Sequence, residues 1–143
     1  IQQYRYGGSV TFEKDIPDTL MTTQIPCFTL QPLLENAIFH GIEPTGLAGK
    51  ITLTGTEEES CIKLVLTDNG KGMTEDMIRR IFSDTTATAT GMFKNIGLLN
   101  VHKRIQYEFG SRYGLSIVSE PEKYTSITIE LPKPNRENGG AQL

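Results

Sequence analysis

The sequence predicts an α+β fold, a two-layer sandwich in which about three helices cover one face of a mixed, mostly antiparallel sheet. Segments with alternating apolar and polar residues occur in pairs, as expected for antiparallel strands. Segments with apolar residues at helical spacing interrupt them in an irregular order. The chain has 143 residues, of which 37% are hydrophobic, so it is long enough for one domain with a buried core.

The N-terminal part is expected to contain one strand. Residues 1–8 are interpreted as the end of a preceding helix or a linker, because the Gly7-Gly8 pair would stop a helix. Residues 9–16 alternate apolar and polar side chains, which predicts a strand. Since residue 1 is not Met, we interpret the sequence as a piece of a longer protein.

The first helix is expected to start near Thr29 and to end at Gly41. Pro32 then lies in the first turn, where a proline is tolerated. Asn36 and His40 lie four residues apart, on a different line of the helix from its apolar stripe. Asn is a weak choice in a helix interior, so Asn36 is a candidate functional residue. The apolar stripe consists of Leu30, Leu33, Leu34, Ala37 and Ile38.

The rest of the chain alternates between strand and helix patterns. A hairpin is expected at residues 50–56 and 61–67, and a short helix from the N-cap Thr74 to about Phe82. A third helix is expected from Asn95 to Gly110, with an apolar stripe of Leu98, Val101, Ile105 and Phe109. Two further strands, expected to be antiparallel neighbours, are residues 115–119 and 126–131. Residues 83–91 form a predicted mobile loop, and residues 133–143 a predicted disordered tail after a domain that spans residues 9–132.

The composition excludes several kinds of partner. With 14 basic and 17 acidic residues the net charge is −3, which offers no basic surface for nucleic acid. A bound polyanion would therefore be held locally, by backbone amides and a metal ion. No segment approaches the roughly 20 apolar residues of a membrane span, so no membrane contact by this chain is expected. Cys27 and Cys61 are interpreted as reduced core residues.

The segment Asp68-Asn69-Gly70-Lys71-Gly72 follows directly after a predicted buried strand. A carboxylate at Asp68 could accept a hydrogen bond from the exocyclic amine of adenine, whereas guanine has a carbonyl oxygen at that place. The two glycines would let the backbone approach a flat ring closely. The same residues are also typical of a plain turn, and both interpretations stay open.

Phosphate and metal could be bound near the predicted helix ends. Gly97 lies just inside the start of the third helix, where free N–H groups favour anions, although it could also be only a small residue in that place. The side-chain oxygen of Asn36 suits Mg²⁺. Glu35 could orient water or a metal-bound ligand, or be a surface residue. His40 could contact a nucleotide or be a half-buried histidine, and His102 is expected to be an exposed helix residue.

Taken in this order, the segments resemble the ATP-binding fold shared by histidine kinases, gyrase-type topoisomerases, the ninety-kilodalton heat-shock chaperone and MutL mismatch-repair proteins. The string Gln31-Pro32-Leu33-Leu34-Glu35-Asn36-Ala37-Ile38-Phe39-His40-Gly41 is similar to the Q-P-L-x-E-N-A-x-x-H-G box of LytS/YesM-type sensor histidine kinases. Residues 125–132 look like the closing strand of that family. The resemblance covers nearly the whole chain up to Pro132.

This resemblance implies an ATP-binding catalytic domain with the histidine kinase ATPase fold. Asn36 would be the ligand of a Mg²⁺ ion bound to the triphosphate and, with Glu35, would be catalytic. Asp68 would bind the adenine amine with help from Thr125. Gly97 and Leu98 would meet the phosphates, and residues 83–95 would be the ATP lid. The residues implied to bind the nucleotide are Asn36, His40, Asp68, Gly70, Gly72, Met73, Gly97, Leu98 and Thr125.

The resemblance also implies partners. The domain would donate the γ-phosphoryl of Mg-ATP to a histidine on a separate helical domain of the homodimeric full-length protein, and a response regulator would receive it. That histidine is not expected in this chain, which would be the cytoplasmic domain of a membrane-anchored protein. The alternatives are another ATPase or a protein serine kinase of the same fold, or a degenerate nucleotide-binding or dimerisation module without transfer activity. Phe39 and Asn95, which replace a basic residue and a glycine of the family pattern, favour the degenerate module.

Overall fold

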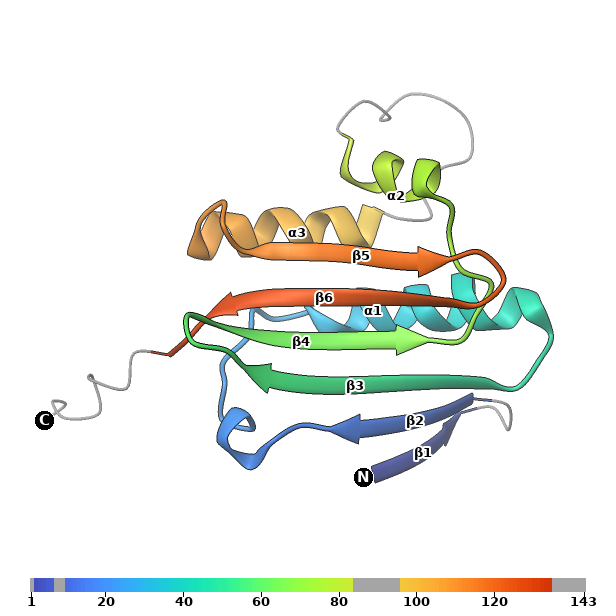
Figure 1. Ribbon diagram of the computed structural model, residues 1–143, viewed down its shortest axis with the longest axis horizontal. Coiled ribbons are helices and arrows are strands. Elements are labelled where there is room, and N and C mark those ends of the chain that lie inside the picture. Colours follow the sequence, from blue (N-terminus) through green and yellow to red (C-terminus); the bar gives the residue numbers. More distant parts are fainter. Residues whose placement is uncertain (1, 7–9, 84–95, 135–143) are drawn as a thin grey trace, which may run out of the picture.

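The computed structural model describes residues 2–6, 10–83 and 96–134, and these form one six-stranded sheet with helices packed on one face (Figure 1). The strand order is β1-β2-β3-β4-β6-β5, and all neighbours are antiparallel except β2 and β3. The predicted α+β sandwich with a mixed, mostly antiparallel sheet is therefore confirmed. The strands are β1 Gln2–Tyr6, β2 Val10–Asp15, β3 Gly49–Glu57, β4 Cys61–Asp68, β5 Gly114–Glu120 and β6 Tyr124–Pro132.

Two long helical segments pack on the sheet. In Figure 1 they lie behind it, and α3 contacts β5 and β6 while η2 contacts β3, β4 and β6. The helices are η1 Asp18–Leu20, α1 Leu30–Glu35, its continuation η2 Asn36–Ile42, η3 Glu43–Thr45, α2 Glu75–Phe82 and α3 Ile96–Phe109. None of the helices in the described ranges combines the length and the apolar character that a bilayer crossing requires.

The core lies between the sheet and these helices. Alternate residues of β3, β4 and β6 point to the helices, and the predicted apolar stripes of the first and third helices face them. Burial of each large aliphatic side chain contributes about 1.5–3 kcal/mol. The most deeply buried members of this core, each at most 1% exposed, include Leu33, Ile51, Ile62, Leu66, Leu98, Ile105, Ile127, Ile129 and Leu131.

The N-terminal segment differs from its prediction. The expected helix end at residues 1–8 is wrong for Gln2–Tyr6, which forms β1 and pairs with β2 in antiparallel register, Tyr6 opposite Val10. Tyrosine is favoured in strands, and the free edge of β2 supplies hydrogen-bond partners that a short helix lacks. The glycine pair suggested the end of a helix, but the pairing of this segment with β2 determines its structure.

The predicted stop of the first helix at Gly41 is also wrong. The chain widens into the π-helix η2, in which the N–H of Glu43 bonds to the carbonyl of Ile38, and the helical path continues through η3. It ends at Gly46, which adopts φ 66°. A left-handed conformation of this kind terminates helices and costs glycine little.

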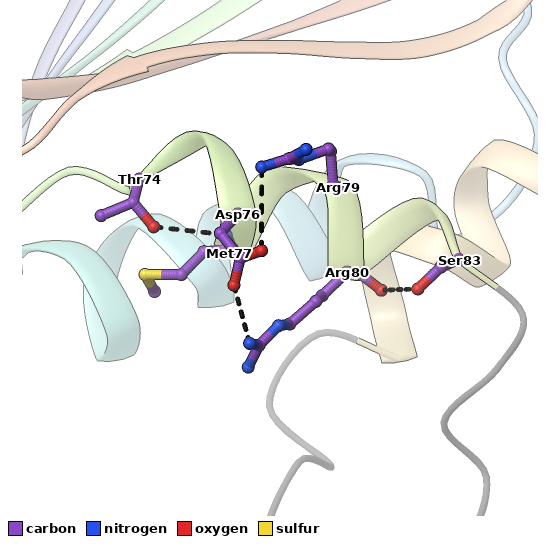
Figure 2. A network of polar contacts seen from close by, with 6 residues as sticks. All are labelled: Thr74, Asp76, Met77, Arg79, Arg80 and Ser83. Atoms are coloured by element: carbon purple, nitrogen blue, oxygen red, sulfur yellow. Dashed lines mark hydrogen bonds and ion pairs between the residues drawn. The ribbon is translucent and has the colours of Figure 1, made fainter.

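The short helix α2 starts as predicted, since the Thr74 Oγ1 accepts a hydrogen bond from the N–H of Met77. Asp76 forms ion pairs with Arg79 at 3.8 Å and Arg80 at 2.7 Å, as Figure 2 shows. These exposed pairs contribute little stability. The chain leaves α2 at Ser83. Apart from Ser83, the predicted loop (residues 83–91) and lid (residues 83–95) lie outside the described ranges, and so does the predicted tail from residue 135 on.

His102 and Cys27 occupy other environments than expected. His102 is half-buried rather than exposed: its Nδ1 accepts a hydrogen bond of 2.9 Å from the N–H of Leu115, and its ring contacts Phe82 edge-on. Burial lowers the pKa of His102. Cys27 is exposed, whereas Cys61 is buried as predicted, and both are free thiols. Helical spacing alone could not show that β5 lies under His102.

Candidate functional site

A small pocket lies where η2, the loop after β4 and the beginning of β6 meet. Its volume is about 60 Å³. Five of its lining residues were predicted from the sequence to bind a ligand: Asn36, His40, Gly72, Met73 and Thr125. The remaining lining residues are Gly41, Lys71 and Met77 of α2. The folded chain thus brings together residues that are up to 89 positions apart in sequence, from Asn36 to Thr125.

One row of residues crosses the sheet at the pocket, and of this row Thr125 belongs to the pocket lining, whereas Asp68 and Ser119 do not. Asp68 at the end of β4 is the register partner of Thr125 on β6, and Thr125 is the partner of Ser119 on β5. Side chains of directly opposed residues point to the same face of a sheet. The carboxyl and the two hydroxyl groups therefore lie side by side on the face that the helices cover.

Asp68 presents a buried acceptor at this row. The residue is 1% exposed, and its Oδ1 accepts a hydrogen bond of 2.9 Å from the N–H of Gly70. Its Oδ2 is buried and has no hydrogen-bond partner among the described residues. Burial raises the pKa of Asp68 to about 6, against the lowering effect of the Gly70 bond. An unpaired buried acceptor costs about 1–3 kcal/mol, so Oδ2 is suited to a donor supplied by a ligand.

Asn36 presents a second buried hydrogen-bond acceptor. It is 5% exposed, and its Oδ1 is likewise buried without a hydrogen-bond partner in the described part of the chain. Asn36 is the first residue of η2, and the wider π turn brings it to the pocket together with His40 and Gly41. Short π segments within helices occur frequently at functional sites.

The residues around Asn36 fit a Mg²⁺ ion that takes few of its ligands from the protein. The described residues include no group of three or more His, Cys, Asp or Glu side chains that could hold a metal ion. A cation here would therefore take few oxygen atoms from the protein and most from water and from its ligand. Mg²⁺ prefers this arrangement when it is bound with phosphates.

The glycines of the site are needed for close backbone packing. A Cβ on Gly70 would lie 2.3 Å from the carbonyl carbon of Gly41, and the N–H of Lys71 bonds to the Gly41 oxygen at 2.9 Å. Gly72 adopts φ 68°, and a Cβ there would lie 2.1 Å from the carbonyl oxygen of Glu120. Both the turn and the ligand interpretation of this segment are thus compatible with its geometry.

The predicted phosphate contacts lie at the beginning of α3. Gly97 faces α1, since a Cβ on it would lie 3.1 Å from the Cβ of Pro32. Leu98 is 1% exposed, and its side chain belongs to the core. The structure places neither among the residues that line the pocket. Only the backbone N–H groups of these two residues, in the first turn of the helix, are suited to bind a phosphate.

Glu35 lies on a different side of α1 from the pocket lining. It is exposed, and its Oε1 accepts a hydrogen bond of 2.9 Å from Gln31 Nε2. Phe39 is also exposed, at 49%. Arg104 on α3 donates from Nη1 to the carbonyl of Cys27 at 2.8 Å and so links the segment before α1 to α3.

Sequence reasoning missed Gly41, Lys71, Met77 and Ser119 as site residues. Gly41 was interpreted as a helix stop, but a Cβ on it would lie 2.7 Å from Asp68 Oδ1, so its lack of a side chain leaves room for the carboxylate. Lys71 lies between the predicted residues Gly70 and Gly72, and this proximity in sequence was its signal. Met77 lies four residues after the predicted Met73. Ser119 had no signal, because its position depends on the pairing of β5 with β6.

A second cavity, of about 610 Å³, lies near the C-terminal ends of α3 and β6, around Ile25, Phe109 and Pro132. It is larger than the pocket at Asn36. However, neither of the two unpaired buried oxygen atoms described above belongs to its lining, whereas Asn36, which carries one of them, lines the smaller pocket. The chemistry therefore favours the smaller pocket as the functional site.

The chain is similar to known proteins over most of its length. Residues 27–135 match the family described as histidine kinase-, DNA gyrase B-, and HSP90-like ATPase. The sensor histidine kinase YesM of Bacillus subtilis is 38% identical over 94% of this chain and 22% of its own length. The sensor histidine kinase BtsS of Escherichia coli is 34% identical over 92% of this chain and 21% of its own length. The chain thus spans about a fifth of these relatives.

Solved structures show the same fold. The nucleotide-free catalytic domain of the histidine kinase ThkA has a TM-score of 0.64 at 22% identity, covering 87% of this chain and 81% of that one. The histidine kinase domain of a blue-light activated kinase from Erythrobacter litoralis has a TM-score of 0.55 at 16% identity, covering 87% and 55%. At these identities the likeness concerns the fold.

Proposed function

Because the chain belongs to the family of histidine kinase-, DNA gyrase B- and HSP90-like ATPases, we propose that it is the ATP-binding catalytic domain of a sensor histidine kinase. The observation that carries this proposal is a pair of buried oxygen atoms, Asp68 Oδ2 and Asn36 Oδ1, that find no hydrogen-bond partner in the described part of the chain. One is suited to the amine of adenine and the other to a hard cation beside the phosphates.

The adenine ring would enter the pocket with its exocyclic amine toward Asp68 and Thr125. Met73 and Met77 supply apolar contact, and the glycine-containing loop supplies close backbone. The carboxylate accepts a hydrogen bond that the carbonyl oxygen of guanine cannot donate. Such a buried acceptor discriminates against the wrong base more strongly than an apolar contact does.

The phosphates would extend from the pocket toward Asn36 and the beginning of α3. Asn36 Oδ1 would be the protein ligand of Mg²⁺, which supplies neutralisation of phosphate charge when it is bound. The backbone N–H groups of Gly97 and Leu98 would bind phosphate oxygens without a basic patch. We assign His40 a secondary contact with the nucleotide. Exposed Glu35, which directly precedes Asn36, would orient water or a metal-bound ligand.

Catalysis by this domain would consist of positioning and charge neutralisation, with the nucleophile supplied from outside the chain. The acceptor would be a histidine on a separate helical domain of the homodimeric full-length kinase, and a response regulator would receive the phosphoryl group. The full-length protein would be anchored in a membrane with this domain in the cytoplasm. These partners are proposed from the relatives, of which the chain covers only about a fifth.

A calorimetric titration tests the proposal. The chain is expected to bind ATP in a Mg²⁺-dependent manner at nucleotide concentrations up to about 1 mM, and GTP at least tenfold more weakly. Asp76→Asn, an exposed substitution on α2, is the matched control for carboxylate loss and should leave both affinities unchanged. If no Mg²⁺-dependent ATP binding occurs up to that concentration, the kinase assignment is wrong and a degenerate module is favoured.

A further inference from the structure

We infer that Ser119 is a specificity-determining residue, which acts by fixing the hydroxyl of Thr125 as a hydrogen-bond acceptor that faces the base. Ser119 is half-buried on β5 and is not among the residues that line the pocket. It is therefore a positioning residue for the ligand rather than a contact. The inference rests on the proposed adenine-binding function of the pocket.

Ser119 Oγ makes three hydrogen bonds. It donates to the carbonyl oxygen of Tyr124 at 2.6 Å. It accepts from the N–H of Met73 at 2.7 Å. The third hydrogen bond joins it to Thr125 Oγ1 at 3.0 Å. A hydroxyl group has one hydrogen and two lone pairs, so these three partners use its full capacity.

The direction of the bond to Thr125 follows from this count. A carbonyl oxygen cannot donate, so the single hydrogen of Ser119 points to Tyr124. The hydrogen between Ser119 and Thr125 must then belong to Thr125. With its hydrogen committed to Ser119, Thr125 Oγ1 offers the pocket lone pairs and no donor.

Two acceptors consequently lie on neighbouring strands at the pocket, Thr125 in its lining and Asp68 directly beside Thr125. Thr125 is the register partner of Asp68, whose Oδ2 has no hydrogen-bond partner among the residues that the structure describes. Directly opposed side chains have Cβ atoms about 4.5–5.5 Å apart, within reach of one amino group, directly or through one water. An amino group with two N–H bonds satisfies both acceptors. Hypoxanthine has a carbonyl oxygen in place of the amino group. This oxygen is itself an acceptor, so it could form no hydrogen bond with either of the two acceptors of the protein.

Ser119 also fixes the pocket wall through Met73. The bond from the Met73 N–H anchors the loop after β4 to β5, and Met73 lines the pocket. Loss of the Ser119 hydroxyl would leave that N–H without its partner, and some loss of stability is expected. The test therefore needs a measurement that stability alone does not change, namely the ratio of the inosine to the adenine nucleotide dissociation constants.

The experiment measures Kd for ATP and ITP in the wild-type chain and in Ser119→Ala, Ser119→Thr and Ser116→Ala. In Ser119→Ala the freed Thr125 hydroxyl can turn its hydrogen toward the carbonyl of ITP, so the ITP/ATP ratio should fall about tenfold. Ser119→Thr keeps the hydroxyl and should retain the ratio. Ser116, exposed on the same strand, is the matched control and should change nothing. If Ser119→Ala does not fold, Ser119→Cys, a poor hydrogen-bond partner of similar size, replaces it.

A double-mutant cycle shows whether Ser119 acts through Thr125. In a Thr125→Val background the Ser119 substitution should have no further effect on the ratio. An unchanged ratio in Ser119→Ala, with both affinities reduced equally, would overturn the inference and leave Ser119 a structural residue. This result differs from failure of the proposed function, in which the wild-type chain itself would bind neither nucleotide.

Discussion

Asp68 and Asn36 each hold one buried oxygen atom that has no hydrogen-bond partner within residues 2–6, 10–83 and 96–134. The two differ in what they can do. Asp68 lies at the end of a strand, in a row with two hydroxyl residues, and is suited to a ligand donor. Asn36 lies on a helix whose interior disfavours it, and its amide oxygen is suited to a cation. Unpaired buried acceptors reduce stability, and a folded protein retains such features mainly where function requires them.

These roles lead to different Mg²⁺ dependences. Without Mg²⁺, Asp68→Asn should weaken ATP binding by at least about tenfold, because the nearly isosteric amide disturbs the acceptor for the adenine amine. Asn36→Ala should have little effect under that condition and a large effect once Mg²⁺ is added. Calorimetric titrations with and without EDTA measure both. Equal losses in the absence of Mg²⁺ would contradict the assigned roles.

At the scale of elements, the π-helix η2 decides the geometry of the site. An α-helix would have kept Asn36 and His40 on one line and turned Gly41 away from it. The wider turn puts all three at the pocket, and Gly41 then lies against the Asp68 carboxylate. The loop after β4 bonds to the same glycine through Lys71. One helical irregularity thus connects the side that we propose to bind the metal with the side that we propose to bind adenine.

Gly41→Ala tests this contact. The added Cβ would lie 2.7 Å from Asp68 Oδ1, so the carboxylate or the helix must move. We expect a loss of about 1–3 kcal/mol in the free energy of unfolding, measured by urea denaturation, and weaker ATP binding. Gly46→Ala is the matched control: at φ 66° it is strained, but no atom lies within 4 Å of the added Cβ. It should cost about 1–2 kcal/mol and leave ATP affinity unchanged.

The contact between α3 and β5 makes stability depend on pH. Burial lowers the pKa of His102, and its Nδ1 must stay unprotonated to accept from Leu115. Since the folded-state pKa lies below the ordinary value of 6.5, the unfolded chain binds the proton more readily. The stabilisation is present above about pH 6.5 and is lost as the pH falls through the lowered value.

We expect the wild-type chain to have a lower Tm at pH 5.5 than at pH 7.5. The decrease in Tm should be smaller in His102→Asn, because the side-chain oxygen of Asn can replace Nδ1 as an acceptor and does not titrate. Asp68 acts in the opposite direction, because its pKa is raised to about 6 and its protonation favours the folded state. The difference between the wild-type chain and the His102 variant therefore isolates the histidine. An identical pH dependence in both proteins would refute the role of His102.

At the scale of the whole molecule, one sheet carries the site at one end, and the functional residues of that site come from η2, the loop after β4, α2 and β6. The chain spans about a fifth of YesM and BtsS. In the proposed function this domain would supply the phosphoryl donor, whereas transfer would need an acceptor that we place elsewhere in the full-length protein.

Accordingly, the isolated chain should bind ATP but acquire no acid-labile phosphate when it is incubated with γ-labelled ATP and Mg²⁺. A longer chain that includes the proposed upstream helical domain should become labelled, and Asn36→Ala should abolish this labelling. Acid-labile label on the present chain would contradict the prediction and would point to His40 or His102 as acceptors.

Much of the fold was predictable because its signals are local. The apolar stripes of α1 and α3, the hairpin of β3 and β4 and the Thr74 cap depend on spacing within one segment, and each is present. β1 was mispredicted, because whether a short segment pairs with a neighbour depends on the edge that the neighbour offers. The exposure of His102 was mispredicted for a similar reason, since the strand beneath it comes later in the chain.

The sequence by itself determined the fold class, the family resemblance and the identity of Asn36, Asp68 and Thr125 as candidate ligands, because residue type and order carry that information. Tertiary structure alone decided how they meet. The π turn of η2, the room that Gly41 leaves for Asp68 and the row from Asp68 through Thr125 to Ser119 all arise from hydrogen bonds and contacts between distant segments. Such pairings are fixed only when the sheet assembles, so no local pattern could show which hydroxyl orients which.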